Sequence, residues 1–171
     1  PRLILLDEPF NGLDQPNREA LLSIITDLKD QGISLIISTH DLVQALARLV
    51  DSRRGPGLSI GLDARPPRNL ARPVEVVVLR TVQEALSNIS RHSRAARAEV
   101  VVAVERLGAD RELAITVTDD GAGTGGAPEG TGLTGMRSRV ESLGGTLTVD
   151  PARAPGADGR TGTVVEARIP L

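Results

Sequence analysis

Apolar residues near the start of the chain form two short continuous runs with a helical stripe between them. Leu3–Leu6 and Ile33–Ile37 are the runs, and such runs are typical of parallel strands that are buried on both faces. The segment between them carries apolar residues at helical spacing, namely Leu21, Leu22, Ile25 and Leu28. Asp14 stands where it can cap this helix, which is expected to begin near Pro16. Residues 1–42 are therefore predicted to form a β-α-β unit.

A longer series of elements follows residue 42. The most informative is a helix that begins at Pro73, with an apolar stripe made by Val74, Val78, Val82, Ala85, Leu86 and Ile89. Further helices are expected at 43–54 and 130–143, and strands at 58–62, 98–104, 113–117, 146–149 and 163–169. This order predicts an α/β fold for residues 43–171. Whether the first two strands extend the sheet of this fold or pack separately is left open by the pattern.

Composition narrows the classes of partner. The net charge of -2 and the 1% aromatic content give no reason to expect nucleic acid as a ligand. The absence of cysteine excludes disulfides and thiolate metal sites. No apolar run approaches the roughly 20 residues of a membrane helix, so we expect no membrane segment and a cytoplasmic location.

The composition also changes along the chain. Lys29 is the only lysine, and of the arginines only Arg2 and Arg18 precede residue 43. The later residues are rich in Arg, Ala, Gly, Val and Pro, as in the products of GC-rich genomes. A single domain can vary in composition by chance, so the change alone leaves open whether residues 1–42 and 43–171 differ in origin. Together with the motifs on each side, it predicts a boundary near residue 42.

Polar residues follow both apolar runs of the N-terminal piece. LILLDEP, NGLD and STHD resemble the Walker B, D-loop and switch-histidine segments of ABC transporter ATPases. The resemblance implies that Asp7 would hold magnesium through water, that Glu8 would orient the attacking water and that His40 would sense the γ-phosphate. The chain has no G-x-x-x-x-G-K-[ST] loop to cradle phosphates, because Lys29 lies in Asp-Leu-Lys-Asp. We therefore expect these three residues to be vestigial and the piece to be structural.

The helix that begins at Pro73 has a second face, which carries polar side chains able to bind a metal or a phosphate. Glu84, Asn88 and His92 are spaced at i, i+4 and i+8, so they are predicted to share one side of the helix. Carboxylate and amide oxygens suit magnesium that also binds polyphosphate. On these residues alone, an ordinary solvated face is the favoured explanation of the pattern, ahead of a metal site.

Glycine-rich segments flank the last helix. The strand predicted at 113–117 leads into Asp-Asp-Gly-Ala-Gly at 119–123, where glycine lets the backbone approach a flat ligand and a buried carboxylate could accept the amino group of adenine. Residues 124–132 lack apolar anchors, as expected of a mobile lid. Gly-Thr-Gly-Leu-Thr-Gly-Met at 130–136 then opens a helix, and amides at such a start form an anion site.

QEALSNISRHS, DDGAG, GTGLTGM and GTVVEARIP together resemble the N box, the G1 box, the G2 box and the last strand of the histidine-kinase ATP-binding domain. This is the Bergerat fold, which is shared with gyrase and Hsp90. The resemblance implies an α/β two-layer sandwich with a mixed sheet for residues 43–171, with the β-α-β unit beside it. The subfamily resembled is that of kinases paired with helix-turn-helix response regulators. The similarity spans about residues 46–171 and is densest over 74–171.

The resemblance implies a role for each matching residue. Asp119 would bind the adenine amino group, with Thr163 assisting through water. Asn88 would coordinate Mg²⁺, and Glu84 would act as the base-like catalytic residue. Arg91 and His92 would face phosphate oxygens. The pocket and its lid would be shaped by Gly121, Gly123, Gly130, Gly132, Leu133 and Gly135.

The expected function is ATP binding with Mg²⁺, as in two-component signalling, with a response regulator as partner of the parent kinase. Neither His40 nor His92 lies in the context of a phosphoacceptor histidine, so autophosphorylation is not expected in this chain. Two alternatives stay open at this point: an ABC transporter ATPase subunit, and a non-catalytic chimera whose site is distorted. Apolar faces left exposed on the N-terminal piece would favour a homodimer.

Overall fold

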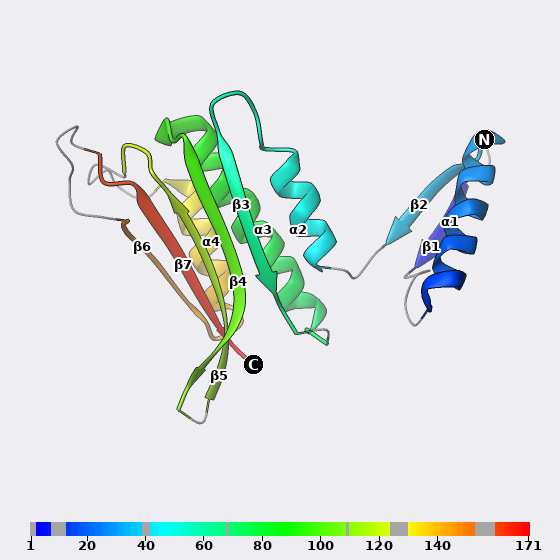
Figure 1. The fold of residues 1–171 in the computed structure, drawn as a ribbon. Helices are drawn as coiled ribbons and strands as arrows, with labels where there is room; N and C mark the ends of the chain where they lie inside the picture. Colours follow the sequence, from blue (N-terminus) through cyan, green and yellow to red (C-terminus); the bar gives the residue numbers. More distant parts are fainter. Residues whose placement is uncertain are drawn as a thin grey trace. The chain divides into compact units, whose positions relative to one another are not determined.

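The computed structural model describes residues 3–7, 13–38, 42–67, 69–108, 110–123, 130–152 and 160–171. The chain divides into two compact units, Pro1–Asp41 and Leu42–Leu171, and each is considered by itself. Their elements are drawn in Figure 1.

The first unit is a small β-α-β arrangement. Strand β1 (Leu3–Asp7) pairs in parallel with β2 (Ser34–Ser38), and helix α1 (Gln15–Asp30) connects them. Asp14 caps α1 as predicted, because its Oδ1 accepts the N–H of Asn17 at 3.1 Å. The two strands form a sheet of their own, which answers the question that the sequence pattern left open.

The second unit contains a five-stranded mixed sheet. Its strands lie in the order β3-β4-β5-β7-β6, with β3 parallel to β4 and the other neighbours antiparallel. The strands are β3 (Ser59–Arg65), β4 (Arg97–Leu107), β5 (Asp110–Asp119), β6 (Thr146–Pro151) and β7 (Thr163–Pro170). The helices are α2 (Leu42–Asp51), α3 (Arg72–Asn88), the π-helical turn η1 (Ile89–Ser93) and α4 (Thr131–Glu141).

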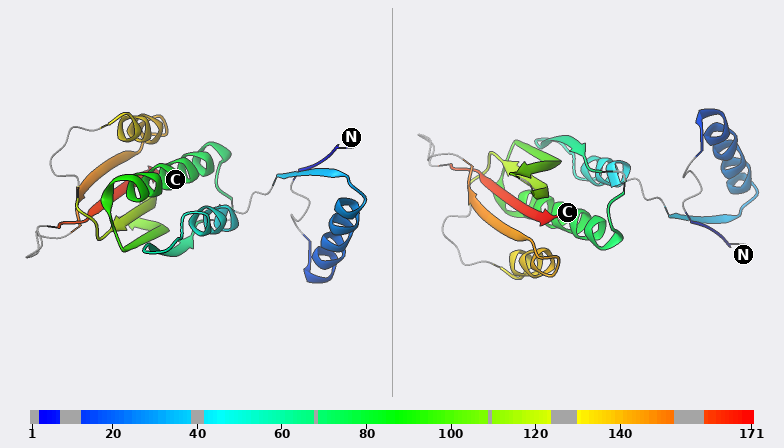
Figure 2. Two further views of the ribbon diagram at one scale, coloured as in Figure 1. Left: turned by 90° about the horizontal axis from the view of Figure 1, so that it is seen from above. Right: turned by 90° about the horizontal axis from the view of Figure 1, so that it is seen from below.

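Helices α2, α3 and α4 lie against one face of this sheet, as the views from above and below show (Figure 2). The core fills the layer between them. Its fully buried side chains include Leu46 and Val50 of α2, Val78, Val82 and Leu86 of α3, Met136 and Val140 of α4, and Val100, Val102, Leu113, Ile115, Ala167 and Ile169 of the strands. The predicted two-layer α/β sandwich with a mixed sheet is confirmed.

The opposite face of the sheet is polar. Arg168 of β7 pairs with Glu105 of β4, with Glu112 of the adjacent β5 and with Glu166 of its own strand; Nη1 lies 2.9 Å from Glu105 Oε2 and Nη2 2.6 Å from Glu166 Oε1. The strands therefore alternate between an apolar face under the helices and a polar face, which is why a two-layer sandwich forms rather than three layers.

Several predicted bounds differ from those observed. Helix α2 ends at Asp51 rather than residue 54, and β4 and β5 extend beyond the predicted strands because their polar ends pair across a hairpin. On α3 the buried stripe is wider than predicted: Val77 and Thr81 are buried, while Val74 at the first turn is half-buried.

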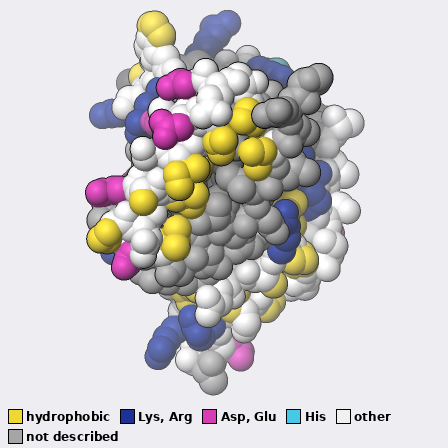
Figure 3. Space-filling model, turned by 90° about the vertical axis from the view of Figure 1, so that its right-hand side faces the viewer, with side chains coloured by type: hydrophobic (Ala, Val, Ile, Leu, Met, Phe, Trp, Pro, Cys, Tyr) yellow, Lys and Arg dark blue, Asp and Glu magenta, His cyan; other side chains and the backbone are white. Residues whose placement is uncertain are grey.

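Some large apolar side chains remain exposed. Ile24 of α1 is 54% exposed and Val76 of α3 is 49% exposed. Figure 3 shows apolar side chains lying next to one another on the face that it draws. The expectation of a homodimer stays a prediction. None of the helices in the described part has the length and apolarity needed to cross a membrane.

Candidate functional site

Asp119 lies at the end of β5 and is 5% exposed. Its Oδ1 accepts the N–H of Gly121 at 2.7 Å, and Thr163, its partner in the β5–β7 register, donates a side-chain hydrogen bond to the carboxylate. Burial raises the pKa of Asp119 above its ordinary value, and the hydrogen bonds from Gly121 and Thr163 oppose that rise. The strand end thus presents a nearly dehydrated carboxylate with acceptor capacity to spare.

Asp120 anchors the same loop to the start of β4. Its Oδ1 accepts the N–H groups of Ala96 at 2.8 Å and Arg97 at 2.9 Å, and Arg97 Nε lies 3.5 Å from Oδ2. Partial burial raises the pKa of Asp120, but the hydrogen bonds from Arg97 and Ala96 outweigh this effect and hold the pKa below its usual range. Sequence reasoning did not single out Asp120, although the doubled aspartate was a visible signal.

Close approach of backbone explains the glycine at position 121. A Cβ there would lie 2.6 Å from both Asp119 Oδ1 and Ser93 Cβ, and closer still to the carbonyl oxygen of Ser93. The N–H of Ala122 donates to that carbonyl at 2.8 Å, so the loop is fixed against the end of η1. A Cβ at Gly123 would overlap Oγ1 of Thr161. The loop is therefore held against neighbouring backbone from two sides.

Glu84 and Asn88 lie one turn apart on α3, and both are half-buried. The chain then enters η1, where Arg91 and His92 are exposed. The predicted step from Asn88 to His92 therefore runs through a π turn, whose hydrogen bonds are i→i+5, rather than through a regular α-helix. The turn ends at Arg94, which has a φ of 52°.

The start of α4 lies beside the carboxylate of Glu84. Gly130 is its N-cap residue and supplies no side chain to the first amides, so these amides are directed at any anion placed before the helix. A Cβ at Gly132 would lie 3.1 Å from Glu84 Cδ and closer still to Oε1. Helices α3 and α4 pack against each other, which brings the predicted base-like residue to the predicted anion site.

Residues 74–171 match the family described as histidine kinase-, DNA gyrase B- and HSP90-like ATPases. The chain belongs to this family. The match begins within α3 and includes η1, the Asp119 loop, α4 and the last strand. The predicted histidine-kinase ATP-binding domain is confirmed.

Similar proteins agree with this assignment. The sensor histidine kinase YxjM of Bacillus subtilis (strain 168) is 30% identical over 154 residues, which are 90% of this chain and 36% of that protein. The histidine kinase domain from the Erythrobacter litoralis EL346 blue-light activated histidine kinase has the same fold, with a TM-score of 0.59 at 23% identity, covering 76% of this chain and 59% of that one. The chain spans 36% or less of the curated relatives it matches.

ABC transporter proteins give shorter matches. The uncharacterized ABC transporter ATP-binding protein MJ1023 of Methanocaldococcus jannaschii is 47% identical over 51 residues, 30% of this chain and 19% of that protein. The alignment with YxjM covers 154 of 171 residues, so it also includes part of residues 1–42. A chimeric origin for this piece stays a prediction.

The predicted site residues fall into two groups in the family's fold. One group surrounds the end of β5: Asp119, Gly121, Gly123 and Thr163. The other lies along α3, η1 and the start of α4: Glu84, Asn88, Arg91, His92, Gly130, Gly132, Leu133 and Gly135. Leu133 is half-buried against the core, and Gly135 faces the Arg139 guanidinium. Glu8 and His40, the Asp7 side chain and lid residues 124–129 lie outside the described residues.

Proposed function

We propose that residues 42–171 bind ATP between the Asp119 loop, α3 with η1, and the start of α4. The observation that carries the proposal is the buried Asp119 carboxylate at the strand end, held by Gly121 and Thr163. A carboxylate in this position accepts the amino group of adenine, and a glycine loop leaves room for the flat base. Family membership of residues 74–171 supports the same function.

The polyphosphate would lie toward α4. The first amides of α4 and the exposed Arg91 and His92 supply positive potential and donors for phosphate oxygens. Asn88 and Glu84 supply two oxygen donors one helical turn apart. This small oxygen set fits Mg²⁺, which keeps several waters and binds largely through phosphate. When bound, Mg²⁺ would neutralise charge on the phosphate oxygens, with Asn88 holding it and Glu84 orienting the reacting group.

The signalling role belongs to a longer protein. We propose that the parent is a cytoplasmic-facing sensor kinase that acts on a response regulator, by analogy with the sensor histidine kinase relatives. His92 is exposed on η1 within the phosphate-facing group, a position that suits nucleotide contact rather than phosphoryl acceptance. The 171 residues would then bind ATP without phosphorylating themselves.

Calorimetric titration with ADP and ATP, with and without Mg²⁺, tests the proposal. The wild type should bind one nucleotide per chain, and Asp119→Asn should abolish binding because an amide presents a weaker acceptor and a competing donor. Asn88→Ala should remove the gain in affinity from Mg²⁺ and leave Mg²⁺-free ADP binding nearly unchanged. A wild type that takes up no nucleotide would overturn the proposal.

The similarity to ABC transporter proteins favours a second candidate, an ABC-type nucleotide site that uses Asp7. Asp7→Asn distinguishes the two. Loss of binding in this variant, with Asp119→Asn unaffected, would favour the second candidate over the first.

A further inference from the structure

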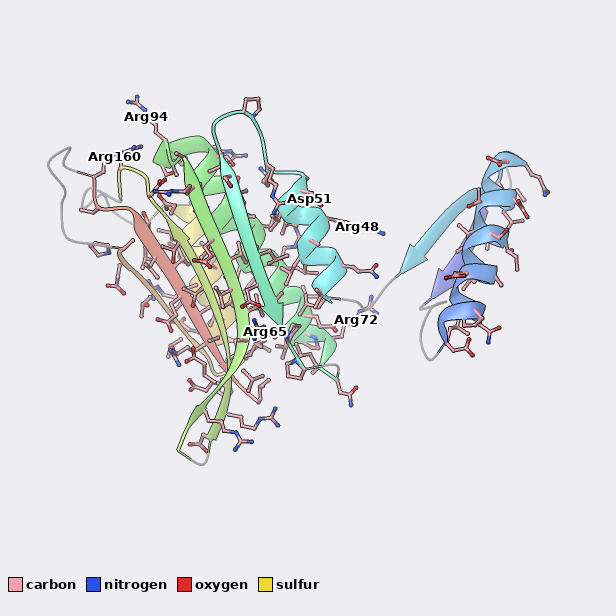
Figure 4. The ribbon with its side chains drawn as sticks, viewed as in Figure 1. Arg48, Asp51, Arg65, Arg72, Arg94 and Arg160 are labelled. Atoms are coloured by element: carbon pink, nitrogen blue, oxygen red, sulfur yellow. The ribbon has the colours of Figure 1, made fainter. Side chains whose placement is uncertain are left out.

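Residues 160–163 lie where β7 begins, and they contact both groups of the candidate site. Arg160 Nη2 donates a hydrogen bond to the carbonyl oxygen of Arg94, the residue that ends η1. Figure 4 shows the labelled Arg94 and Arg160 together at one end of the sheet, at the ends of two segments far apart in sequence. Nothing in the sequence pattern pointed to Arg160.

The next residues hold the Asp119 loop. Gly162 has a φ of 64°, which only glycine adopts readily, and a Cβ there would overlap the Asp119 carbonyl oxygen. Its N–H donates to the Gly121 carbonyl at 3.0 Å. Thr161 packs against Gly123, and Thr163 donates to the Asp119 carboxylate. Four consecutive residues therefore fasten the adenine side of the pocket, and the first of them reaches the end of the N-box helix.

We propose that Arg160 is a positioning residue: its hydrogen bond to Arg94 ties the end of the phosphate-facing helix to the start of β7, the segment that holds the adenine-facing loop. The inference rests on the proposed nucleotide function and deepens it. Without this tie, the described contacts between residues 93–97 and the Asp119 loop would be the Ala122–Ser93 hydrogen bond, the Gly121 packing and the hydrogen bonds of Asp120 to Ala96 and Arg97. The start of β7, which holds the other side of the loop, would lose its hydrogen bond to the end of η1. Nucleotide binding would then have to order the two halves of the pocket, and this ordering lowers the affinity.

The charge of Arg160 has a separate consequence. Burial raises the pKa of Asp119, the neighbouring Asp120 adds to the rise, and Arg160 acts in the opposite direction. Gly121 N–H and Thr163 are the other groups that face the carboxylate, and both are neutral. An ionised carboxylate is the better acceptor for adenine. Removing Arg160 should therefore weaken nucleotide binding more at pH 5 than at pH 8.

The experiment compares ADP affinity of the full chain from pH 5 to 8 for Arg160→Gln, Arg160→Lys and the control Arg65→Gln. Arg65 is an exposed arginine whose Nε lies 2.9 Å from Asp63 Oδ1 on β3, away from the site (Figure 4). Arg160→Gln should weaken binding about tenfold at pH 8, as expected for a charge-assisted hydrogen bond, and by more at pH 5. Arg160→Lys should recover most of the affinity and the wild-type pH profile. Arg65→Gln should match the wild type.

Wild-type affinity and pH profile in Arg160→Gln would overturn the inference while leaving the proposed function intact. Equal weakening in Arg160→Gln and Arg160→Lys, with the pH profile unchanged, would also overturn it, since only packing would then matter. If Arg160→Gln does not fold, the Lys variant alone decides through its pH profile. No binding by the wild type would instead refute the proposed function, and this inference with it.

Discussion

Gly121→Ala is the most informative single change in the nucleotide loop. The added Cβ would lie 2.6 Å from Ser93 Cβ and 2.6 Å from Asp119 Oδ1, where ordinary van der Waals contacts are 3.4–4 Å. One of its neighbours is backbone, the Ser93 carbonyl, so a rotamer change cannot relieve the clash. The loop and the end of η1 would have to separate by about 1 Å, the difference between these distances and an ordinary contact.

The loss of stability in Gly121→Ala follows from the contacts that this separation of the loop and η1 breaks. Overpacking of this kind costs about 1–3 kcal/mol. The Ala122 N–H to Ser93 carbonyl bond of 2.8 Å joins the two parts that must move, and losing it costs about 1 kcal/mol more. The sum is about 2–4 kcal/mol, or about 5–15 °C in melting temperature for a domain of this size. ADP binding should fall as well, because the displaced backbone carries Asp119.

Thermal melting followed by far-UV circular dichroism measures the effect, since the chain has no tryptophan or tyrosine to report by fluorescence. The matched control is Gly61→Ala on β3, where the nearest atoms to an added Cβ are 3.9 Å away. That variant should keep its stability or gain up to about 1 kcal/mol from the stiffer unfolded chain. Equal melting temperatures for the two variants would refute the steric reasoning.

Three further predictions concern stability. Because the folded-state pKa of Asp119 is raised by burial, its carboxyl adds stability below its unfolded-state pKa and loses it as the pH rises through the folded value. Asp119→Asn should thus gain stability relative to wild type between pH 4 and pH 7, as measured by thermal melts, while losing nucleotide. Asp120 has a lowered pKa, so its stabilisation is present at neutral pH and lost in acid. Asp120→Ala should cost about 1–3 kcal/mol at pH 7 in urea unfolding, and the difference should shrink toward pH 3. Thr81 Oγ1 is buried with no hydrogen-bond partner among the described residues, so Thr81→Val should add about 1 kcal/mol in the same assay.

The spacing of apolar residues along the chain predicted most of the helices and strands, because each of them depends on residues that are close in sequence. The spacing of residues in the sequence was enough to predict the apolar stripe of α3 and the glycine-rich start of α4. The strand order β3-β4-β5-β7-β6 could not be read, since pairing is set by packing between distant segments. The parallel pair of β1 and β2 was predictable because a single helix joins two continuous apolar runs.

The π turn escaped prediction because α-helical spacing was extended through it. Ser90 and Ser93 donate their hydroxyls to the carbonyls of Leu86 and Ile89, local bonds that compete with the regular helix ladder. Arg160 escaped for a different reason. Its partner lies 66 residues earlier in the chain, and no local pattern announces such a contact.

We propose one nucleotide pocket, built by the end of β5, α3 with η1, and the start of α4. A ¹H–¹⁵N correlation spectrum of the isotope-labelled chain, recorded with and without ADP, locates the site directly. We expect the amide signals of Gly121, Gly123, Gly132 and Thr163 to shift, while those of α1 stay in place. Shifts confined to residues 1–41, or no shifts at saturating ADP, would contradict it.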